Sequence, residues 1–304
     1  MLKRNPRAAL RPFVRTLWVT QQPSIPRPPA ASREHVLPTG DMHIVFRLCN
    51  HPLRLYDDVQ DSSGCTVGHM VVGGPRATFY LRDISEPAWS VGAQLSAGAS
   101  DLLFGVPADK LAGRHTPLDL LWGRSAELMR DQLFAARGPE HQLDILESIL
   151  AARLPRVRGL HPAVAQALER FQTTSDVGAA AKAAGYSHRH FIELFLQGVG
   201  LTPRLFCRVL RFQRVLDRVT ADQTASWTDL ALASGYSDQS HFNREFREFA
   251  GVTPGEYREM SPCFPHHVPL RRSIRSPPEG QIRSRQDEGP APESGRRPST
   301  KGDL

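Results

Sequence analysis

The sequence predicts an α+β protein with a β-rich, barrel-like N-terminal domain carrying helices, an all-α C-terminal domain and a disordered C-terminal tail. Apolar and polar residues alternate with period two near residue 42, whereas a helical period dominates after residue 160. A helical unit also occurs twice, with its turn glycines Gly185 and Gly235 about 50 residues apart. A repeat found only twice indicates paired units and not a solenoid.

The N-terminal domain is expected to span residues 1–155. Residues 1–20 fit a short helix or strand pair, and the Pro-rich residues 21–34 fit an exposed loop. Short apolar runs separated by turn residues are typical of a small barrel or sandwich. The strands are expected in the runs 42–48, 67–72, 77–81 and 89–95.

The pattern becomes helical after residue 100. Two amphipathic helices are expected at 126–136 and 141–154, and in the second Leu143, Leu146 and Leu150 share one face. Shorter helical turns and apolar segments are expected at 101–104, 108–111 and 117–122. Residues 155–159, with proline, glycine and arginine, form a linker candidate.

The C-terminal domain is expected at residues 160–260. Its first helix, 161–171, has Pro162 in the first turn, where a missing N–H is tolerated. A helix at 177–184, the Gly185 turn and a further helix make the first copy of the repeat. The long helix 203–219 joins the two copies, with its apolar residues on one face and arginines mostly outward.

The second copy of the repeat, residues 226–258, predicts helix, tight turn, helix. Ser226 with Asp229 fits a capping box, and Ser237 or Asp238 can cap the second helix. Its apolar side is Phe242, Phe246 and Phe249, and its polar side is Gln239, Ser240, Asn243, Arg244 and Arg247. Two short helices with such a polar second helix describe a helix-turn-helix that can enter a DNA major groove.

These residues resemble the AraC/XylS family of transcription regulators. The similarity is carried by Ala-Ser-Gly-Tyr-Ser-Asp-Gln-Ser-His-Phe-Asn-Arg-Glu-Phe (233–246) and Gly-Val-Thr-Pro-Gly-Glu-Tyr-Arg (251–258). The first half is similar to the N-terminal domain of a subset of these regulators, through segments such as 36–46, 92–99 and 103–111. The resemblance implies a DNA-binding domain and a sensory or dimerising domain.

The candidate DNA contacts lie on the second helix of each copy. Amide and guanidinium groups match base edges and phosphates, so the second copy offers Asp238, Gln239, Ser240, Asn243, Arg244 and Arg247. The first copy offers His188, Arg189, His190, Ile192 and Glu193. The family usually has a basic residue at the position of Glu193, so this carboxylate either weakens the contact or accepts from a cytosine amine.

The charge distribution gives no support of its own to DNA binding. The net charge is +7, yet residues 159–260 hold 11 Lys or Arg and 11 Asp or Glu. The four cysteines form no C-x-x-C pair, and His35, His43, His51 and His69 have no ligand spacing, so no metal and no cofactor are expected. No apolar run of 18 residues predicts a membrane helix.

Three functions remain open from the sequence. The first is a sequence-specific regulator in the cytoplasm, at the nucleoid, with promoter DNA as partner; a small-molecule effector, RNA polymerase and a second copy of the chain are further candidate partners. The second is an enzyme such as a DNA-repair methyltransferase, which needs a packed nucleophile that Cys263 does not offer. The third is a partner-binding protein that no longer binds DNA.

Residues 261–304 have almost no apolar side chains and are expected to be disordered. A chain ending at Met260 should therefore keep its fold.

Overall fold

The computed structural model describes residues 1–21, 32–154, 160–262 and 264–270. These described residues all lie within one compact unit, Met1–Arg271. Most of the predicted loop 21–34, the predicted linker 155–159, Cys263 and residues 271–304 lie outside the described residues.

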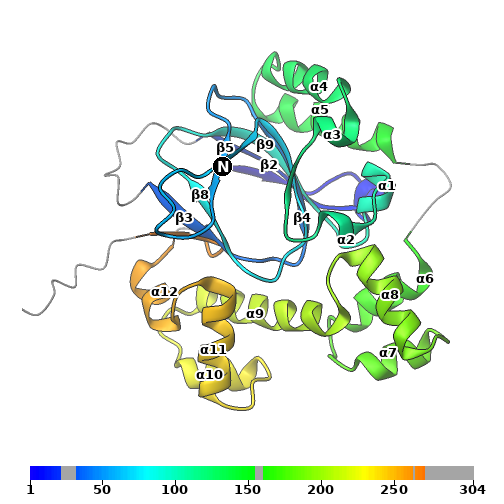
Figure 1. Ribbon diagram of the computed structural model, residues 1–304, viewed down its shortest axis with the longest axis vertical. Helices are drawn as coiled ribbons and strands as arrows, with labels where there is room; N and C mark the ends of the chain where they lie inside the picture. The colour runs from blue at the N-terminus through cyan, green and yellow to red at the C-terminus, as the bar shows by residue number, and fades with distance from the viewer. Residues whose placement is uncertain (22–31, 155–159, 263, 271–304) are drawn as a thin grey trace, which may run out of the picture. The chain divides into compact units, whose positions relative to one another are not determined.

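The N-terminal residues form two antiparallel sheets, which confirms the β-rich prediction (Figure 1). The first sheet has the order β1-β2-β9-β4-β7-β10. Its strands are Leu2–Arg4 (β1), Val14–Gln21 (β2), Met42–Arg47 (β4), Met70–Gly73 (β7), Trp89–Leu95 (β9) and His115–Pro117 (β10). In β4, Met42, Ile44 and Phe46 are buried as the period-two alternation predicts.

The second sheet has the order β11-β3-β8-β5-β6. Its strands are Arg33–Val36 (β3), Leu53–Tyr56 (β5), Cys65–Gly68 (β6), Tyr80–Asp83 (β8) and His267–Pro269 (β11). The apolar run 67–72, expected as one strand, is divided between the two sheets, since β6 ends at Gly68 and β7 begins at Met70. Gly68 has a φ of 135°, a backbone conformation that breaks a continuous strand.

Helices close one side of the first sheet's core. They are Ala8–Leu10 (η1), Ser100–Phe104 (α1), Ala108–Leu111 (α2), Asp119–Trp122 (α3), Ser125–Phe134 (α4) and Pro139–Arg153 (α5). The α5 residues Leu143, Leu146 and Leu150 are fully buried among the residues of β2, β4 and β9. Both long helices lie where the sequence predicts them.

The C-terminal residues form seven helices among the described residues. They are Pro162–Arg170 (α6), Val177–Ala183 (α7), His188–Val199 (α8), Pro203–Ala221 (α9), Trp227–Ala233 (α10), Gln239–Ala250 (α11) and Pro254–Met260 (α12). Figure 1 shows α7 and α8 at one end of α9, and α10, α11 and α12 at the other. The long joining helix and the repeated helix pairs are as predicted from the sequence.

The chain after α12 corrects the predicted start of the disordered tail. Strand β11 pairs antiparallel with β3, and Val268 is fully buried. The Tyr257 hydroxyl donates to the Pro265 carbonyl at 2.9 Å, and the Leu37 amide donates to the His266 carbonyl at 2.9 Å. A single apolar residue, Val268, and free strand edges on β3 are enough to order this segment, although its composition is polar.

Truncation after Met260 is therefore expected to destabilise the protein, contrary to the composition-based expectation. The change removes β11, exposes the site of Val268 and leaves β3 without a neighbour on that side. We expect a loss of at least about 2 kcal/mol in the free energy of unfolding, measured by urea denaturation. A chain truncated after Leu270 keeps β11 and is the control; equal urea midpoints for the two truncations would show that β11 contributes nothing.

Candidate nucleic-acid interface

The first helix-turn-helix is formed by α7, the Gly185 turn and α8. Asp176 caps α7 by accepting from the Ala179 amide at 2.8 Å, and Gly185 turns the chain with a φ of 73°. Ser187 then caps α8 by accepting from the His190 amide at 3.3 Å. Each helix thus begins at a residue that satisfies free N–H groups of its first turn.

The second helix-turn-helix is formed by α10, the Gly235 turn and α11. Gly235 has a φ of 83°, and Asp238 caps α11 by accepting from the His241 amide at 2.8 Å. The capping box predicted at Ser226 is wrong, because the Ser226 side chain makes no capping bond with α10. A capping box is present instead at the start of α12, between Thr253 and Glu256.

The predicted contact residues lie on α8 and α11, most of them in the first half of the helix; Asp238 directly precedes α11 and Arg247 lies in its last turn. All are exposed except Ile192, which is half-buried; the exposed ones are His188, Arg189, His190, Glu193, Asp238, Gln239, Ser240, Asn243, Arg244 and Arg247. In α11 these groups lie opposite the buried Phe242, Phe246 and Phe249. Each recognition helix therefore has one apolar side and one polar side that a nucleic acid can approach.

Four of the candidate side chains already have partners within the protein, and one of them is Gln239, whose Oε1 accepts from the Thr228 hydroxyl at 3.4 Å. Asp238 caps α11 and also accepts from the Ser237 hydroxyl at 2.9 Å, so its carboxylate has a structural role. Arg189 and Glu193 form an exposed ion pair at 3.1 Å, one turn apart on α8. Glu193 thus draws the guanidinium of Arg189 toward itself in the free protein.

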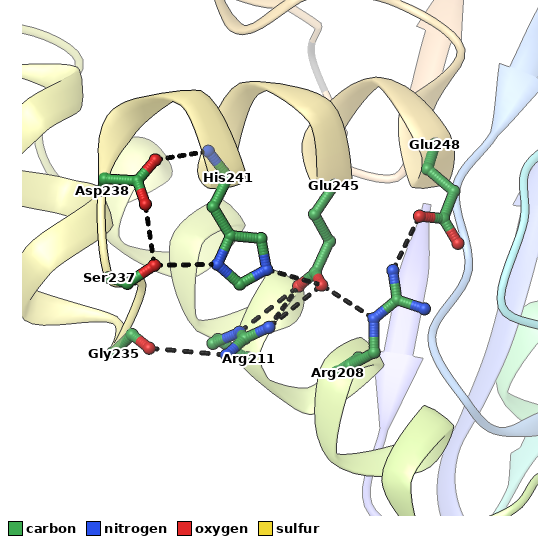
Figure 2. Close-up of polar contacts among 8 residues, drawn as sticks. All are labelled: Arg208, Arg211, Gly235, Ser237, Asp238, His241, Glu245 and Glu248. Atoms are coloured by element: carbon green, nitrogen blue, oxygen red, sulfur yellow. Dashed lines mark hydrogen bonds and ion pairs between the residues drawn. The ribbon is translucent and has the colours of Figure 1, made fainter.

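Helix α11 is held on α9 by a buried carboxylate that the sequence analysis missed. Glu245 is 2% exposed and accepts from Arg208 Nε at 2.7 Å and from Arg211 Nη2 at 2.9 Å (Figure 2). Arg211 also donates to the Gly235 carbonyl at 3.4 Å, which ties the turn to α9. Arg208 reaches a second carboxylate, that of Glu248, at 2.7 Å.

Three of the five α9 arginines correct the expectation that these side chains are mostly outward, whereas Arg204 and Arg218 are exposed as expected. Arg208 and Arg211 are half-buried and bind Glu245, and Arg214 donates to the carbonyls of Phe171 and Gln172. The signal in the sequence is Glu245 itself, which lies on the apolar stripe three residues after Phe242. A carboxylate on an apolar stripe facing an arginine-rich helix indicates a buried ion pair.

The ionisation of Glu245 decides how strong this attachment is. Desolvation raises the pKa of the carboxyl, but hydrogen bonds from Arg208 and Arg211 outweigh it, and the net pKa is lowered. Glu245 is therefore ionised at neutral pH. Because its folded-state pKa is depressed, its stabilisation is present above the unfolded pKa and is lost as pH falls through the folded pKa.

His241 is half-buried and belongs to the same scaffold, not to the exposed face. Its Nδ1 lies 3.3 Å from the Ser237 hydroxyl and its Nε2 lies 3.8 Å from Glu245 Oε2. The ring also packs edge-on against Tyr236, at 5.5 Å between centroids. These contacts fix the first turn of α11, from which Gln239, Ser240 and Asn243 project.

Comparison with known proteins identifies this pair of helix-turn-helices. Residues 180–260 match the model of a helix-turn-helix domain family, and residues 3–117 match a domain family of unknown function. The transcriptional regulator GlxA of Rhizobium meliloti is 31% identical over 158 residues, which cover 49% of this chain and 48% of GlxA. The chain therefore carries a helix-turn-helix domain of the AraC type. An uncharacterised regulator of Haemophilus influenzae is 28% identical over 100 residues, 33% of each chain.

Some solved structures are also similar, at low sequence identity. A structure from Chromobacterium violaceum, titled as an AraC-type DNA-binding domain-containing regulator, is 25% identical, with a TM-score of 0.30, and covers 33% of this chain and 91% of its own. ToxT of Vibrio cholerae O395 is 11% identical, with a TM-score of 0.42, and covers 82% of this chain and 98% of its own. The chain spans about half the length of GlxA and about a third of the length of the Haemophilus regulator.

Two further features concern the described residues alone. None of their helices is long and apolar enough to cross a membrane. The structure brings no three of their histidine, cysteine, aspartate and glutamate side chains into a group that could hold a metal ion, His35, His43, His51 and His69 included.

Replacement of Glu245 tests the attachment of α11. Glu245→Ala leaves Arg208 and Arg211 without their shared carboxylate, and we expect a loss of roughly 2–3 kcal/mol in the free energy of unfolding at pH 7. Glu248→Ala is the matched control, since Glu248 is 44% exposed and its loss should change stability by less than about 1 kcal/mol.

The measurement is urea denaturation at pH 7 and at pH 3. The difference between wild type and Glu245→Ala should be smaller at pH 3, because this pH lies below the ordinary glutamate pKa of 4.5, where the stabilisation by a carboxyl of lowered pKa begins to be lost. Equal losses for the two variants at pH 7 would contradict the structural role of Glu245.

Proposed function

We propose that this chain is a sequence-specific DNA-binding transcription regulator of the AraC type. The observation that supports it most is the pair of helices α8 and α11, each capped at its start and exposing polar side chains there. A helix of this kind reads base edges from its first turns when it lies in a major groove. The matched helix-turn-helix domain and the relatives named as regulators support the same function.

The contacts are proposed to be unequal in the two units. Gln239, Ser240 and Asn243 present amide and hydroxyl groups to base edges, and Arg244 and Arg247 reach guanine or phosphate. Thr228 of α10 lies 3.4 Å from Gln239 Oε1, a hydrogen bond that holds the amide in one orientation. In the first unit His188, His190 and Ile192 face the groove, while Glu193 and its ion pair weaken the role of Arg189.

Residues 1–155 are proposed as a sensory or dimerising domain and residues 160–260 as the DNA-binding domain. The partners proposed are promoter DNA, a small-molecule effector, RNA polymerase and a second copy of the chain, in the cytoplasm at the nucleoid. The ordered β11 places the end of the described structure at 270 instead of 260. It joins the DNA-binding part to β3 of the second sheet, so a change in the N-terminal part can reach the helices.

Two other functions are disfavoured. No enzymatic activity is proposed, and the cysteine on which the methyltransferase alternative rests, Cys263, lies outside the described residues. A protein that has lost DNA binding is the third candidate, motivated by Glu193 and the balanced charge. Titration with genomic DNA separates it from a regulator, since binding to phosphates weakens steeply as salt rises and a protein without DNA contacts shows no such binding.

Arg244→Ala tests the proposed contact in the second unit. We expect a loss of about 1–3 kcal/mol in the free energy of binding to a footprinted promoter fragment, because one guanidinium contact is removed. Arg137→Ala, which changes an exposed arginine in the turn between α4 and α5, is the control and should bind as wild type does. Wild-type affinity and salt slope for Arg244→Ala in a filter-binding titration would remove Arg244 from the interface.

Glu193→Arg tests the inequality of the two units. The change replaces a repelled charge by a phosphate contact, so affinity should rise and the salt slope should steepen by about one unit. Arg244→Ala should weaken binding more than Arg189→Ala does. The titrations use a footprinted site with each half-element scrambled in turn. Equal losses for the two half-elements, or weaker binding by Glu193→Arg, would mean that Glu193 reads a base.

A further inference from the structure

Residues 74–79, which cross from β7 in the first sheet to β8 in the second, contact the ends of both recognition helices. Helix α8 ends at Gly200, where an added Cβ would lie 2.4 Å from Pro75 Cγ. Helix α11 ends at Gly251, where an added Cβ would lie 2.6 Å from the Phe79 ring. Both glycines have a left-handed backbone conformation, which other residues rarely adopt. The close approaches also require that no side chain is present at these two positions.

The contact at α11 is reinforced by a hydrogen bond. His35 of β3 stacks on Phe79 with 4.3 Å between ring centroids, and its Nδ1–H donates to the Ala250 carbonyl at 2.8 Å. Each recognition helix has 12 residues and is about 18 Å long, so its DNA-facing start lies that far from this contact. A small displacement of residues 74–79 would therefore move both helix starts.

Arg76 lies in the middle of this segment and lacks a carboxylate partner among the residues that the structure describes. Its Nη2 donates to His115 Nδ1 at 3.1 Å, and its guanidinium lies over the Tyr80 ring at 4.4 Å from the centroid. Loss of hydration is the main cause that lowers the pKa of Arg76. A guanidinium held away from water without an anion is costly.

Arg82, a second arginine in the same region, has a carboxylate partner that balances its charge. Arg82 donates to Glu34, and Glu34 also accepts from His267 Nδ1 at 2.9 Å. Desolvation opposes the ionisation of Glu34, but Arg82 and His267 outweigh it and lower its pKa to about 2. Glu34 is thus already paired with Arg82 and His267, so it does not balance the charge of Arg76.

The side chains around Arg76 add hydrogen-bond donors without adding charge. Desolvation, followed by the nearby cations, lowers the pKa of His43 to about 4 and that of His115 to about 3, so both are neutral at pH 7. Because His115 Nδ1 accepts from Arg76, its proton is on Nε2. Burial raises the pKa of Tyr80, which keeps its hydroxyl proton. Arg76, Tyr80 and His115 all retain accessible surface.

We propose that Arg76, with Tyr80 and His115, binds the carboxylate or phosphate group of a small anionic ligand, and that residues 74–79 transmit this binding to α8 and α11. The ligand supplies the anion that Arg76 lacks, and a guanidinium can bind either group through two parallel hydrogen bonds. This ligand would be the small-molecule effector of the proposed function, with a carboxylate or phosphate group. Its effect on DNA rests on the proposed function, whereas anion binding itself does not.

The binding test uses thermal unfolding of the full chain at constant ionic strength. The probes are inorganic phosphate and sodium benzoate, with benzamide as the uncharged match of benzoate. At saturating probe, we expect one anion to raise the Tm of wild type by about 2 °C or more, while benzamide does not. The probe that raises the Tm shows whether the site prefers a phosphate or a carboxylate group.

Arg76→Gln should abolish this rise, and it should leave the Tm without probe unchanged or higher, because a desolvated cation is removed. Arg114→Gln, which changes an exposed arginine beside His115, is the control and should keep the rise. The anion site is overturned if neither anion raises the wild-type Tm, if Arg76→Gln keeps the rise, or if Arg76→Gln lowers the Tm without probe.

The transmission test measures affinity for a footprinted promoter fragment with and without the active probe. We expect the probe to change the affinity of wild type at least about fivefold and that of Arg76→Gln not at all. A probe that raises the Tm but leaves DNA affinity unchanged overturns transmission. A wild-type protein that binds no DNA overturns the proposed function, and the Tm measurement still decides the anion site.

Discussion

The packing of phenylalanines onto helix α9 is the constraint on which the DNA-binding part depends. Phe206 of α9 meets Phe195 of the first unit edge-on, with 5.6 Å between ring centroids. Phe212 of α9 meets Phe246 and Phe249 of the second unit at 5.3 and 5.4 Å. These rings are almost completely buried, and separating one from its neighbours costs about 1.5–3 kcal/mol. Neither recognition helix can swing away from α9 without opening its own core.

Polar contacts fix the orientation of α11 on α9. An aromatic stripe alone lets a helix rotate or slide by small amounts, whereas Glu245 fixes the azimuth of α11 through two arginines one turn apart on α9. Arg211 also binds the turn before α11, so the turn and the helix share one attachment. The first unit has no equivalent of Glu245, since Leu194 occupies the position before Phe195 that Glu245 occupies before Phe246.

The local parts of the fold could be predicted from the sequence, and the non-local parts could not. Phe242, Phe246 and Phe249 repeat at helical spacing, and Gly185 and Gly235 mark the turns, so both helix-turn-helices follow from neighbouring residues. Strand β11 pairs with a strand more than 230 positions earlier, and no local pattern around Val268 announces it. Strand order in the two sheets is non-local for the same reason.

In the candidate interface, too, the local features could be predicted from the sequence and the non-local contacts could not. Exposure of Gln239, Asn243 and Arg244 follows from their spacing against the phenylalanines, and the structure agrees. The partners of the α9 arginines were not predictable from periodicity, because a half-buried arginine and an exposed one occupy the same face of a helical wheel. The close approach of Pro75 to Gly200 could not be predicted either. A glycine at the end of a helix is already explained by its left-handed backbone, so it does not indicate a neighbouring residue.

The central claim is that one chain holds α8 and α11 at a fixed separation and in the same register on DNA. Hydroxyl-radical footprinting of a promoter fragment bound by one chain per site tests it most directly. We expect two protected segments on one face of the duplex, centred about 10–10.5 base pairs apart, which appear together at a single protein concentration. A single protected segment, or two that fill at different concentrations, would contradict a rigid pair of recognition helices.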